Sequence, residues 1–401
     1  MLIYAVMNKI NRMTYNRKNI ICIFFIVTLA GIIYSNSFDA SFHFDDTPAI
    51  IENYAIHRFD VREIFSTSTR PVLDLTFALN YYFGKLNVFG YHLVNLLLHM
   101  ANGVMLYFIL LWTINPLNRV SSEISANSVN FKIPLYAGMI FTAHPIQTQA
   151  VTYIVSRSSV LATTFYLLAF LFFIRAFRIS NPLLLTYRSL LYLIGAFLAS
   201  CLGMATKQEA ATLPLMLLIY DFYFISEGDL KLLRGNYKVH IAMFLTLAVI
   251  FYLSFSGLQS SVSFDYTKGV PMPQEEPITS FEYFLTQLHV IPYYIKLLFV
   301  PTNLNFDYDW PITKTIDMKT IFFFIFLGSL IILALRLFRK ARLISFGILW
   351  FFITLSVTSS FVIIYDVIFE HRLYLPSIGF AVIPAFLIGK ISGLRIGKIA
   401  R

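Results

Sequence analysis

Hydrophobic residues of this chain are gathered into long runs that short polar stretches separate. An apolar run of about 20 residues crosses the ~30 Å hydrocarbon core of a bilayer as a helix. The pattern predicts ten transmembrane helices, at about residues 20–34, 91–112, 133–144, 158–177, 189–206, 210–223, 240–258, 321–335, 343–363 and 375–388. We therefore expect an all-α integral membrane protein, a polytopic bundle of about ten transmembrane helices in a single domain, residues 1–401.

Two longer polar segments, residues 36–90 and 259–319, predict two outer loops. Within the first, residues 70–82 indicate a short interfacial helix that leads into the second span. Within the second, residues 281–300 are apolar enough to cross the membrane, but a crossing there would place four basic residues, 336–342, outside. We expect residues 281–300 to lie along the interface as an amphipathic helix instead.

The basic residues set the orientation of this bundle. Twenty of the 31 Lys and Arg residues fall in the N-terminus, the C-terminus and the loops that this topology places together. Positive charge is retained on the cytoplasmic side of membrane proteins. Both termini are therefore expected in the cytoplasm, and both long loops outside.

Composition supports a membrane protein, because 58% of the residues are hydrophobic and only 13% are charged. The net charge of +10 could suggest nucleic acid. Orientation and anionic lipid headgroups explain the basic excess without it, so membrane lipids are the expected partner and nucleic acid is not. Cys22 and Cys201 both lie in apolar runs and indicate no disulfide framework.

The first outer loop opens with the sequence His43-Phe44-Asp45-Asp46. Two adjacent carboxylates at a membrane surface repel each other and are partly desolvated, so at least one should have a raised pKa, as a general base requires. Taken alone, the pair also suits a solvated loop or a helix N-cap before Pro48. A divalent metal ion on His43 and both aspartates is another alternative, but no second cluster completes the ligand set.

A polar stripe runs through the second predicted span. His92, Asn95, His99 and Asn102 recur at helical spacing and share one face, which should point into the bundle. For His99 and Asn102 we favour hydrogen bonding between helices over catalysis. His92 is near the outer end and is a candidate to reach substrate.

Ionisable residues gather at the predicted outer ends of later spans. Arg157 begins the fourth span, Lys207 and Glu209 follow the fifth, and the string from Glu370 through Tyr374 precedes the last. A single cation at a helix end often extends only to the headgroups. Several cations on one face with Asp45 and Asp46 are typical of a site that binds a lipid phosphate.

These segments together resemble the transmembrane O-mannosyltransferases of the cadherin-targeting type and their bacterial relatives, within the GT-C glycosyltransferases. The matching stretches are spread from about residue 44 to residue 380, in the family's order. The most specific are His92-Leu93-Val94-Asn95-Leu96-Leu97-Leu98-His99 and Arg372-Leu373-Tyr374-Leu375-Pro376-Ser377-Ile378-Gly379-Phe380. The others are Phe44-Asp45-Asp46 with Asn53, Arg70-Pro71 to Asn80-Tyr81, Phe141 to Pro145 with Arg157, and Lys207-Gln208-Glu209.

The resemblance implies an inverting transfer of a sugar, mannose in that family, from a polyprenyl or dolichyl monophosphate to an acceptor hydroxyl on the outer face. Asp45 matches the family's loop aspartate and is the expected general base, with Asp46 as its partner. The expected phosphate ligands are Arg157, Lys207, His371 and Arg372. Further substrate contacts are expected from Arg70, His92, His144, Glu209, Glu370 and Tyr374, with no cofactor and no metal ion favoured.

The acceptor, a protein or a glycan, is not indicated by the sequence. Members of that family usually continue into tetratricopeptide repeats, and no such repeat pattern is present here. For that reason a bacterial cytoplasmic membrane is expected rather than the endoplasmic reticulum. Three rival functions remain: a lipid-linked sugar flippase or transporter, a polysaccharide ligase that uses a pyrophosphate donor, and a non-catalytic membrane scaffold. A flippase would favour ionisable groups near the bilayer midplane, and here most acids fall in the two outer loops.

Overall fold

The helices of the computed structural model follow the hydrophobic runs. The structure describes residues 2–115, 130–179, 186–253, 278–364 and 366–391; for residues 2–14 and 391 it describes the backbone alone. The described residues form helices and contain no strand. The helices are α1 (Leu2–Ile33), α2 (Tyr54–Arg58), α3 (Val61–Thr67), α4 (Pro71–Gly84), α5 (Val88–Ile114), α6 (Lys132–Ala143), α7 (Thr148–Thr152), α8 (Arg157–Ile179), α9 (Tyr187–Met204), α10 (Leu213–Tyr220), α11 (Leu230–Gly235), α12 (Tyr237–Leu245), α14 (Ser280–Phe299), α15 (Met318–Leu337), α16 (Arg342–Leu355) and α17 (Ser377–Ile391).

Shorter 3-10 and π turns join several of these helices. They are η1 (Thr47–Ile51), η2 (Pro145–Gln147), η3 (Ile154–Ser156), η4 (Gln208–Thr212), η5 (Asp221–Ile225) and η6 (Glu370–Leu373). Five of the six adjoin or contain residues that the sequence marks as chemical candidates. The irregular backbone is therefore concentrated where the polar chemistry is expected.

Five segments among the described residues are long and apolar enough to cross a membrane. They are Tyr15–Ile33, Val88–Ile114, Ile154–Ile179, Tyr187–Met204 and Met318–Leu337. Three shorter apolar helices accompany them, at Tyr237–Leu253, Arg342–Leu355 and Ser377–Lys390. The protein is thus an all-α membrane protein.

Two predicted helix ends are instructive. Helix α6 stops at Ala143, before His144 and Pro145, because proline disfavours helix in the residue before it. The predicted span 343–363 is wrong at its end, since α16 stops at Leu355. The hydroxyls of Ser356 and Thr358 bond to the carbonyls of Ile353 and Leu355, and such local bonds compete with continued helix.

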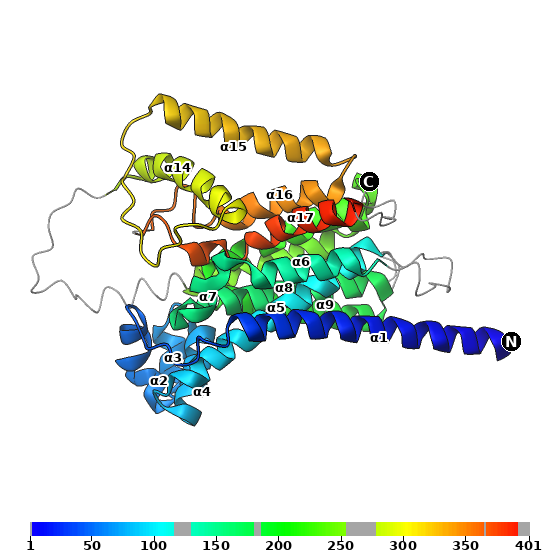
Figure 1. The fold of residues 1–401 in the computed structure, drawn as a ribbon, viewed down its shortest axis with the longest axis horizontal. Coiled ribbons are helices and arrows are strands. Elements are labelled where there is room, and N and C mark those ends of the chain that lie inside the picture. Colours follow the sequence, from blue (N-terminus) through cyan, green and yellow to red (C-terminus); the bar gives the residue numbers. More distant parts are fainter. Residues whose placement is uncertain (1, 116–129, 180–185, 254–277, 365, 392–401) are drawn as a thin grey trace, which may run out of the picture.

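Most of the long helices pack side by side with their axes close to parallel (Figure 1). Helix α1 runs along one side of this bundle and α15 along the other. The short helices α2, α3 and α4 form a group at one end, opposite the N-terminus of α1, and α7 lies at that same end. This end of the bundle, called the site end below, carries residues 36–90, which the sequence predicts as an outer loop. The names first outer loop and second outer loop denote the two predicted segments, residues 36–90 and 259–319, whichever side of the membrane they lie on.

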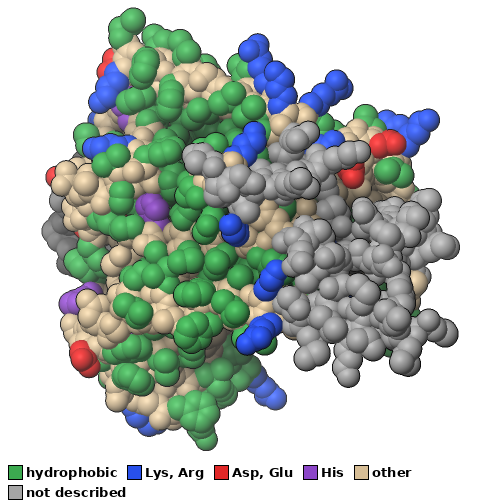
Figure 2. Space-filling model, turned by 45° about the vertical axis from the view of Figure 1, so that its right-hand side comes forward, with side chains coloured by type: hydrophobic (Ala, Val, Ile, Leu, Met, Phe, Trp, Pro, Cys, Tyr) green, Lys and Arg blue, Asp and Glu red, His purple; other side chains and the backbone are tan. Residues whose placement is uncertain are grey.

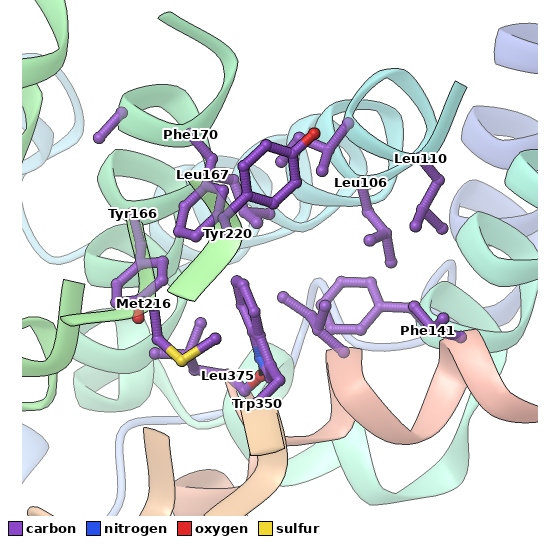
Figure 3. Packing of buried hydrophobic residues seen from close by; sticks show 14 of the residues in the cluster. Leu106, Leu110, Phe141, Tyr166, Leu167, Phe170, Met216, Tyr220, Trp350 and Leu375 are labelled. Carbon is purple, nitrogen blue, oxygen red and sulfur yellow. Dashed lines mark hydrogen bonds between the residues drawn. The ribbon is translucent and has the colours of Figure 1, made fainter. Parts of the chain in front are cut away.

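The core of the bundle is aromatic. Trp350 of α16 contacts Tyr166 and Phe170 of α8, with ring centroids 5.4 and 5.2 Å apart. Its indole N–H donates to the carbonyl of Leu375 over 2.9 Å, which satisfies the one polar atom of the ring. Figure 3 shows these rings packed with leucines from α5 and with Phe141 of α6.

The surface is strongly apolar. Figure 2 shows a face on which hydrophobic side chains form broad patches and few acidic side chains appear. Helix α15 is the least buried of the five candidate spans, because only 17% of its most apolar 18 residues are buried inside the protein. Exposed apolar area on this scale is typical of a lipid-facing surface.

The polar stripe of α5 joins helices inside the bundle, as predicted for His99 and Asn102. His99 bonds through Nδ1 to the Tyr374 hydroxyl at 2.7 Å and through Nε2 to the Thr142 carbonyl at 3.1 Å. The Asn102 amide donates to the Val160 carbonyl and to Tyr374, both over 3.0 Å. Four segments distant in sequence are thereby fixed to one another in an apolar interior, where an unpaired polar group is costly.

Candidate functional site

A short irregular segment between α6 and α8 supports the site end. After Pro145 breaks the helix, the chain makes η2, α7 and η3 in only twelve residues. The side chains of Gln149 and Tyr153 are four residues apart, and the Tyr153 N–H bonds to the Gln149 carbonyl. They therefore project from one face of this turn, and we call the pair the crossbar.

The crossbar connects three parts of the chain. The Gln149 amide donates to the Phe306 carbonyl over 2.7 Å, and its oxygen accepts the His371 N–H over 2.8 Å. The Tyr153 hydroxyl accepts the Asp45 N–H over 3.0 Å. The first outer loop, the second outer loop and η6 consequently meet at one place.

Asp46 anchors the first outer loop. Its carboxylate is buried, 1% exposed, and accepts the N–H groups of His43 at 3.0 Å and Val155 at 2.8 Å. Burial raises the pKa of Asp46, and the two backbone hydrogen bonds oppose that shift. The sequence predicts a raised pKa for at least one acid of this pair, and in the structure Asp46 has it.

Asp45 is held differently from its neighbour. Its side chain is exposed, while its backbone is fixed by the bond to Tyr153. Phe44 adopts a left-handed φ of 46°, strained for a residue with a side chain, and stacks on Phe306 at 5.0 Å. The loop thus presents the carboxylate of Asp45 outward from a rigid backbone.

Four basic residues, Arg70, Lys207, His371 and Arg372, form a second group that we call the basic cluster. The positive charges of Arg70 and Arg372 act on Lys207, and those of Lys207, Arg372 and Arg70 act on His371. Their proximity follows from the packing: the Val72 N–H at the start of α4 bonds to the Ala205 carbonyl at the end of α9.

Lys207 is buried in an ion pair. Its Nζ lies 2.6 Å from Oε1 of Glu209 and donates to Ser159 over 2.8 Å. Burial lowers the pKa of Lys207, and Glu209 opposes that shift. Burial together with the three positive neighbours holds the pKa of His371 well below its usual value, so its imidazole is neutral at neutral pH.

The basic cluster contains donors and acceptors without partners. Nη2 of Arg372 donates to the Asp366 carbonyl, but Nη1 is buried and makes no hydrogen bond to the described residues, and Nδ1 of His371 is in the same situation. Leaving a buried polar group unpaired costs about 1–3 kcal/mol. Glu209 is paired with Lys207, and the charge of Arg70 acts on Asp74. An anion would satisfy the free donor of Arg372.

Arg157 stands apart from the basic cluster, although it was predicted as a phosphate ligand. It is fully buried, and all three of its nitrogens donate within the protein: Nε to Asn95, Nη1 to Asn80 and Thr76, and Nη2 to the Tyr91 carbonyl. Its guanidinium also lies 4.5 Å from the ring of Phe77. These contacts favour a structural role, in which Arg157 joins α4 and α5 to α8.

Most of the side chains predicted to contact substrate already make hydrogen bonds within the protein. His92 bonds to the Ala40 carbonyl and His144 to the Leu298 carbonyl. The Tyr374 hydroxyl is used inside the bundle. Glu370 accepts from the Asn305 N–H and from the Tyr308 hydroxyl, and burial raises its pKa. All four side chains hold neighbouring segments together. Of the six predicted substrate contacts, only Arg70 and Glu209 lie at the basic cluster.

The crossbar residues and the aromatic residues around them are not among the residues predicted from the sequence. Gln149 and Tyr153 could have been found from the helix break at Pro145, which marks irregular backbone at the predicted outer surface. Phe306, which packs 4.7 Å from Tyr153, carried no comparable signal. No group of three or more His, Cys, Asp or Glu side chains suited to a metal ion occurs in the part of the chain that the structure describes.

Fold and site together define a class: a helical membrane protein with an exposed carboxylate and a cluster of basic residues at one end of its bundle. The chain is 26% identical to human protein O-mannosyl-transferase TMTC3 over 96% of its own length, and 26% identical to human TMTC4 over 91%. It is 28% identical to human TMTC2 over 75%. These similarities confirm the resemblance to the transmembrane O-mannosyltransferases.

The chain spans about half the length of the curated relatives it matches, with 44% of TMTC3 and 55% of TMTC4 covered. No family model matches the chain. No solved structure matches it either.

Proposed function

We propose that this protein is a membrane glycosyltransferase that moves a sugar from a polyprenyl or dolichyl monophosphate to an acceptor hydroxyl on the outer face of the membrane. The names of its relatives favour mannose as the sugar and a protein as the acceptor. The observation that carries the proposal is the crossbar, which ties the loop of Asp45 and the basic cluster to two residues one helical turn apart, Tyr153 and Gln149.

In this proposal the basic cluster binds the donor phosphate. Arg70, Lys207 and Arg372 supply the positive charge, and Arg372 has a buried donor without a partner for it. Cations placed where negative charge develops stabilise a leaving phosphate. Because His371 is neutral, it contributes hydrogen bonding rather than charge.

Asp45 is proposed as the general base. Its carboxylate takes the proton of the acceptor hydroxyl while the acceptor oxygen bonds to the anomeric carbon. The bond from that carbon to the phosphate oxygen breaks, and its electrons leave with the lipid phosphate. A single displacement of this kind inverts the anomeric centre. Asp46 holds the loop rather than the substrate.

We also propose that the site end is the outer end, with about ten crossings and both termini in the cytoplasm. The site end contains the starts of α5, α8 and α17 and the ends of α6 and α9, and the basic segments predicted to be inside adjoin the opposite ends of these helices. The bacterial cytoplasmic membrane is the proposed location.

The test is transfer by the purified protein in lipid vesicles. Asp45→Asn should abolish sugar transfer and leave binding of the monophosphate donor intact, whereas the control Asp39→Asn, at another exposed acid of the same loop, should keep both. Full transfer by Asp45→Asn would refute its role as base.

The donor and the product separate this proposal from its rivals. A transferase of the proposed type releases lipid monophosphate from a monophosphate donor. A polysaccharide ligase would require a pyrophosphate donor, and a flippase would move the donor across the bilayer without releasing any lipid phosphate. Either of these two results would overturn the proposal.

A further inference from the structure

Phe44 is an exposed aromatic residue in a strained backbone conformation. Its φ of 46° lies in the left-handed region, which glycine adopts freely and a residue with a Cβ atom adopts at a cost. Its side chain is nevertheless 65% exposed, so burial of apolar area does little to offset that cost. A strained residue that gains little from burial is a candidate for a role in binding.

The ring of Phe44 is open on one face. The other face stacks on the ring of Phe306, with ring centroids 5.0 Å apart and an interplanar angle of 19°. Because this stacking occupies one face, the exposed area belongs to the opposite face and to the ring edge. We call the stacked rings of Phe44 and Phe306 the aromatic pair.

The crossbar supports the aromatic pair from behind. The ring of Phe306 packs edge to face on the ring of Tyr153, with centroids 4.7 Å apart. The carbonyl of Phe306 accepts the amide of Gln149 over 2.7 Å. The open face of Phe44 is therefore part of a braced surface, and not of a side chain that extends alone into solvent.

The aromatic pair lies beside both halves of the candidate site. Phe44 directly precedes Asp45 in the chain. On the other side, the Gln149 amide that binds the Phe306 carbonyl also accepts the N–H of His371, so one amide group joins the pair to the basic cluster. A sugar whose phosphate is bound by the basic cluster, and whose anomeric carbon is attacked by a hydroxyl at Asp45, has to lie between these two groups.

An open aromatic face suits a pyranose ring. The face of an aromatic ring carries partial negative charge. The faces of a pyranose present C–H groups, which are apolar and weakly positive, while its hydroxyls point outward from the rim. Sites for small molecules commonly combine such apolar or aromatic surfaces with a few polar groups that fix orientation, and Asp45 and the basic cluster are the polar groups here.

We propose that Phe44 binds the transferred sugar, with a C–H face of the pyranose against the open face of its ring. This inference rests on the proposed function and adds to it a residue that positions the sugar. Phe44 makes no bond to the reacting atoms. It acts by fixing the place of the anomeric carbon relative to Asp45.

The test compares the binding of two lipids to the full chain in phosphatidylcholine nanodiscs, without acceptor. One lipid is polyprenyl monophosphate that carries mannose, and the other is the same monophosphate without a sugar. Phe44→Leu keeps an apolar side chain and removes the flat face. It should weaken binding of the mannose-bearing lipid about three- to tenfold and leave binding of the sugar-free lipid unchanged.

Two further variants separate contact with the sugar from support of the loop. Phe44→Tyr keeps the ring face and should retain the affinity of the wild type for the mannose-bearing lipid. Phe89→Leu is the matched control, because Phe89 is also an exposed phenylalanine, 49% exposed, that packs on another ring, that of Phe38 at 5.1 Å. It should change the binding of neither lipid.

An equal loss of affinity for both lipids in Phe44→Leu would overturn the inference, because it would show that Phe44 supports the loops or contacts the lipid chain. Unchanged affinity for both lipids, or a raised KM for the acceptor alone, would also overturn it. If the wild-type protein bound neither lipid, the proposed function itself would fall, and this inference with it.

Phe44→Gly tests the strain argument separately. Glycine adopts the left-handed backbone without strain, so this variant should unfold at the same temperature as the wild type or higher while it loses the preference for the mannose-bearing lipid. A lower melting temperature together with a retained preference would give the aromatic pair a structural role alone.

Discussion

The neighbours Asp45 and Asp46 have different surroundings although the sequence presents them as a pair. The carboxylate of Asp46 is buried and accepts two backbone N–H groups, whereas that of Asp45 is exposed. Both oxygens of Asp46 accept backbone N–H groups, so this carboxylate holds the loop and has no free oxygen directed at a substrate. For this reason the proposed mechanism gives the base role to Asp45.

Tyr153→Phe should slow transfer without weakening donor binding. The change keeps the ring against Phe306 and removes only the hydroxyl that fixes the Asp45 backbone. A lost hydrogen bond of about 1 kcal/mol predicts a roughly five- to tenfold lower kcat. Steady-state kinetics measure the change, and Gln149→Leu is the comparison, because loss of its bond to His371 should instead raise KM for the donor.

Lys207 gives a prediction about pH. Burial lowers its pKa, so its positive charge is lost as pH rises through a value below the usual one, and donor affinity should fall over that alkaline range. Lys207→Arg stays charged there and should retain affinity at alkaline pH. Donor binding measured from pH 6 to pH 10 checks both expectations; identical profiles would remove Lys207 from the phosphate site.

Among the helices, α16 and α17 cross with their backbones in close contact at Gly347 and Gly379. A Cβ atom added to Gly347 would lie 2.7 Å from the Gly379 carbonyl oxygen, closer than a carbon and an oxygen approach without displacement. Both helices contribute to the core around Trp350 (Figure 3). A shift at this crossing would therefore be transmitted into the packed interior.

Gly347→Ala should destabilise the protein, because the two helices must separate. Overpacking of this kind costs typically about 1–3 kcal/mol. Gly328→Ala on α15 is the matched control, since no atom lies within 4 Å of the added Cβ, and there the better helix propensity of alanine makes the change neutral or mildly stabilising. Thermal unfolding in detergent compares the two; equal melting temperatures would contradict the close contact.

For the whole molecule, the distribution of charge predicts the orientation. Glu63 is exposed at the site end and Glu227 is exposed beyond η5, near the basic segments expected inside. In intact cells, a membrane-impermeant maleimide should label Glu63→Cys and should reach Glu227→Cys only after permeabilisation, with Cys22 and Cys201 replaced in both. The reverse pattern would place the site end in the cytoplasm.

The apolar runs determined the helical class, because apolar side chains favour transfer from water into the membrane. Pro145 determined where α6 ends, because proline restricts the local backbone. The sequence also named the basic residues that could bind a phosphate. It could not separate Arg157, fully bonded inside the bundle, from Arg70 and Arg372. That separation depends on which helices pack together, and only the tertiary structure brings residues so distant in sequence into contact.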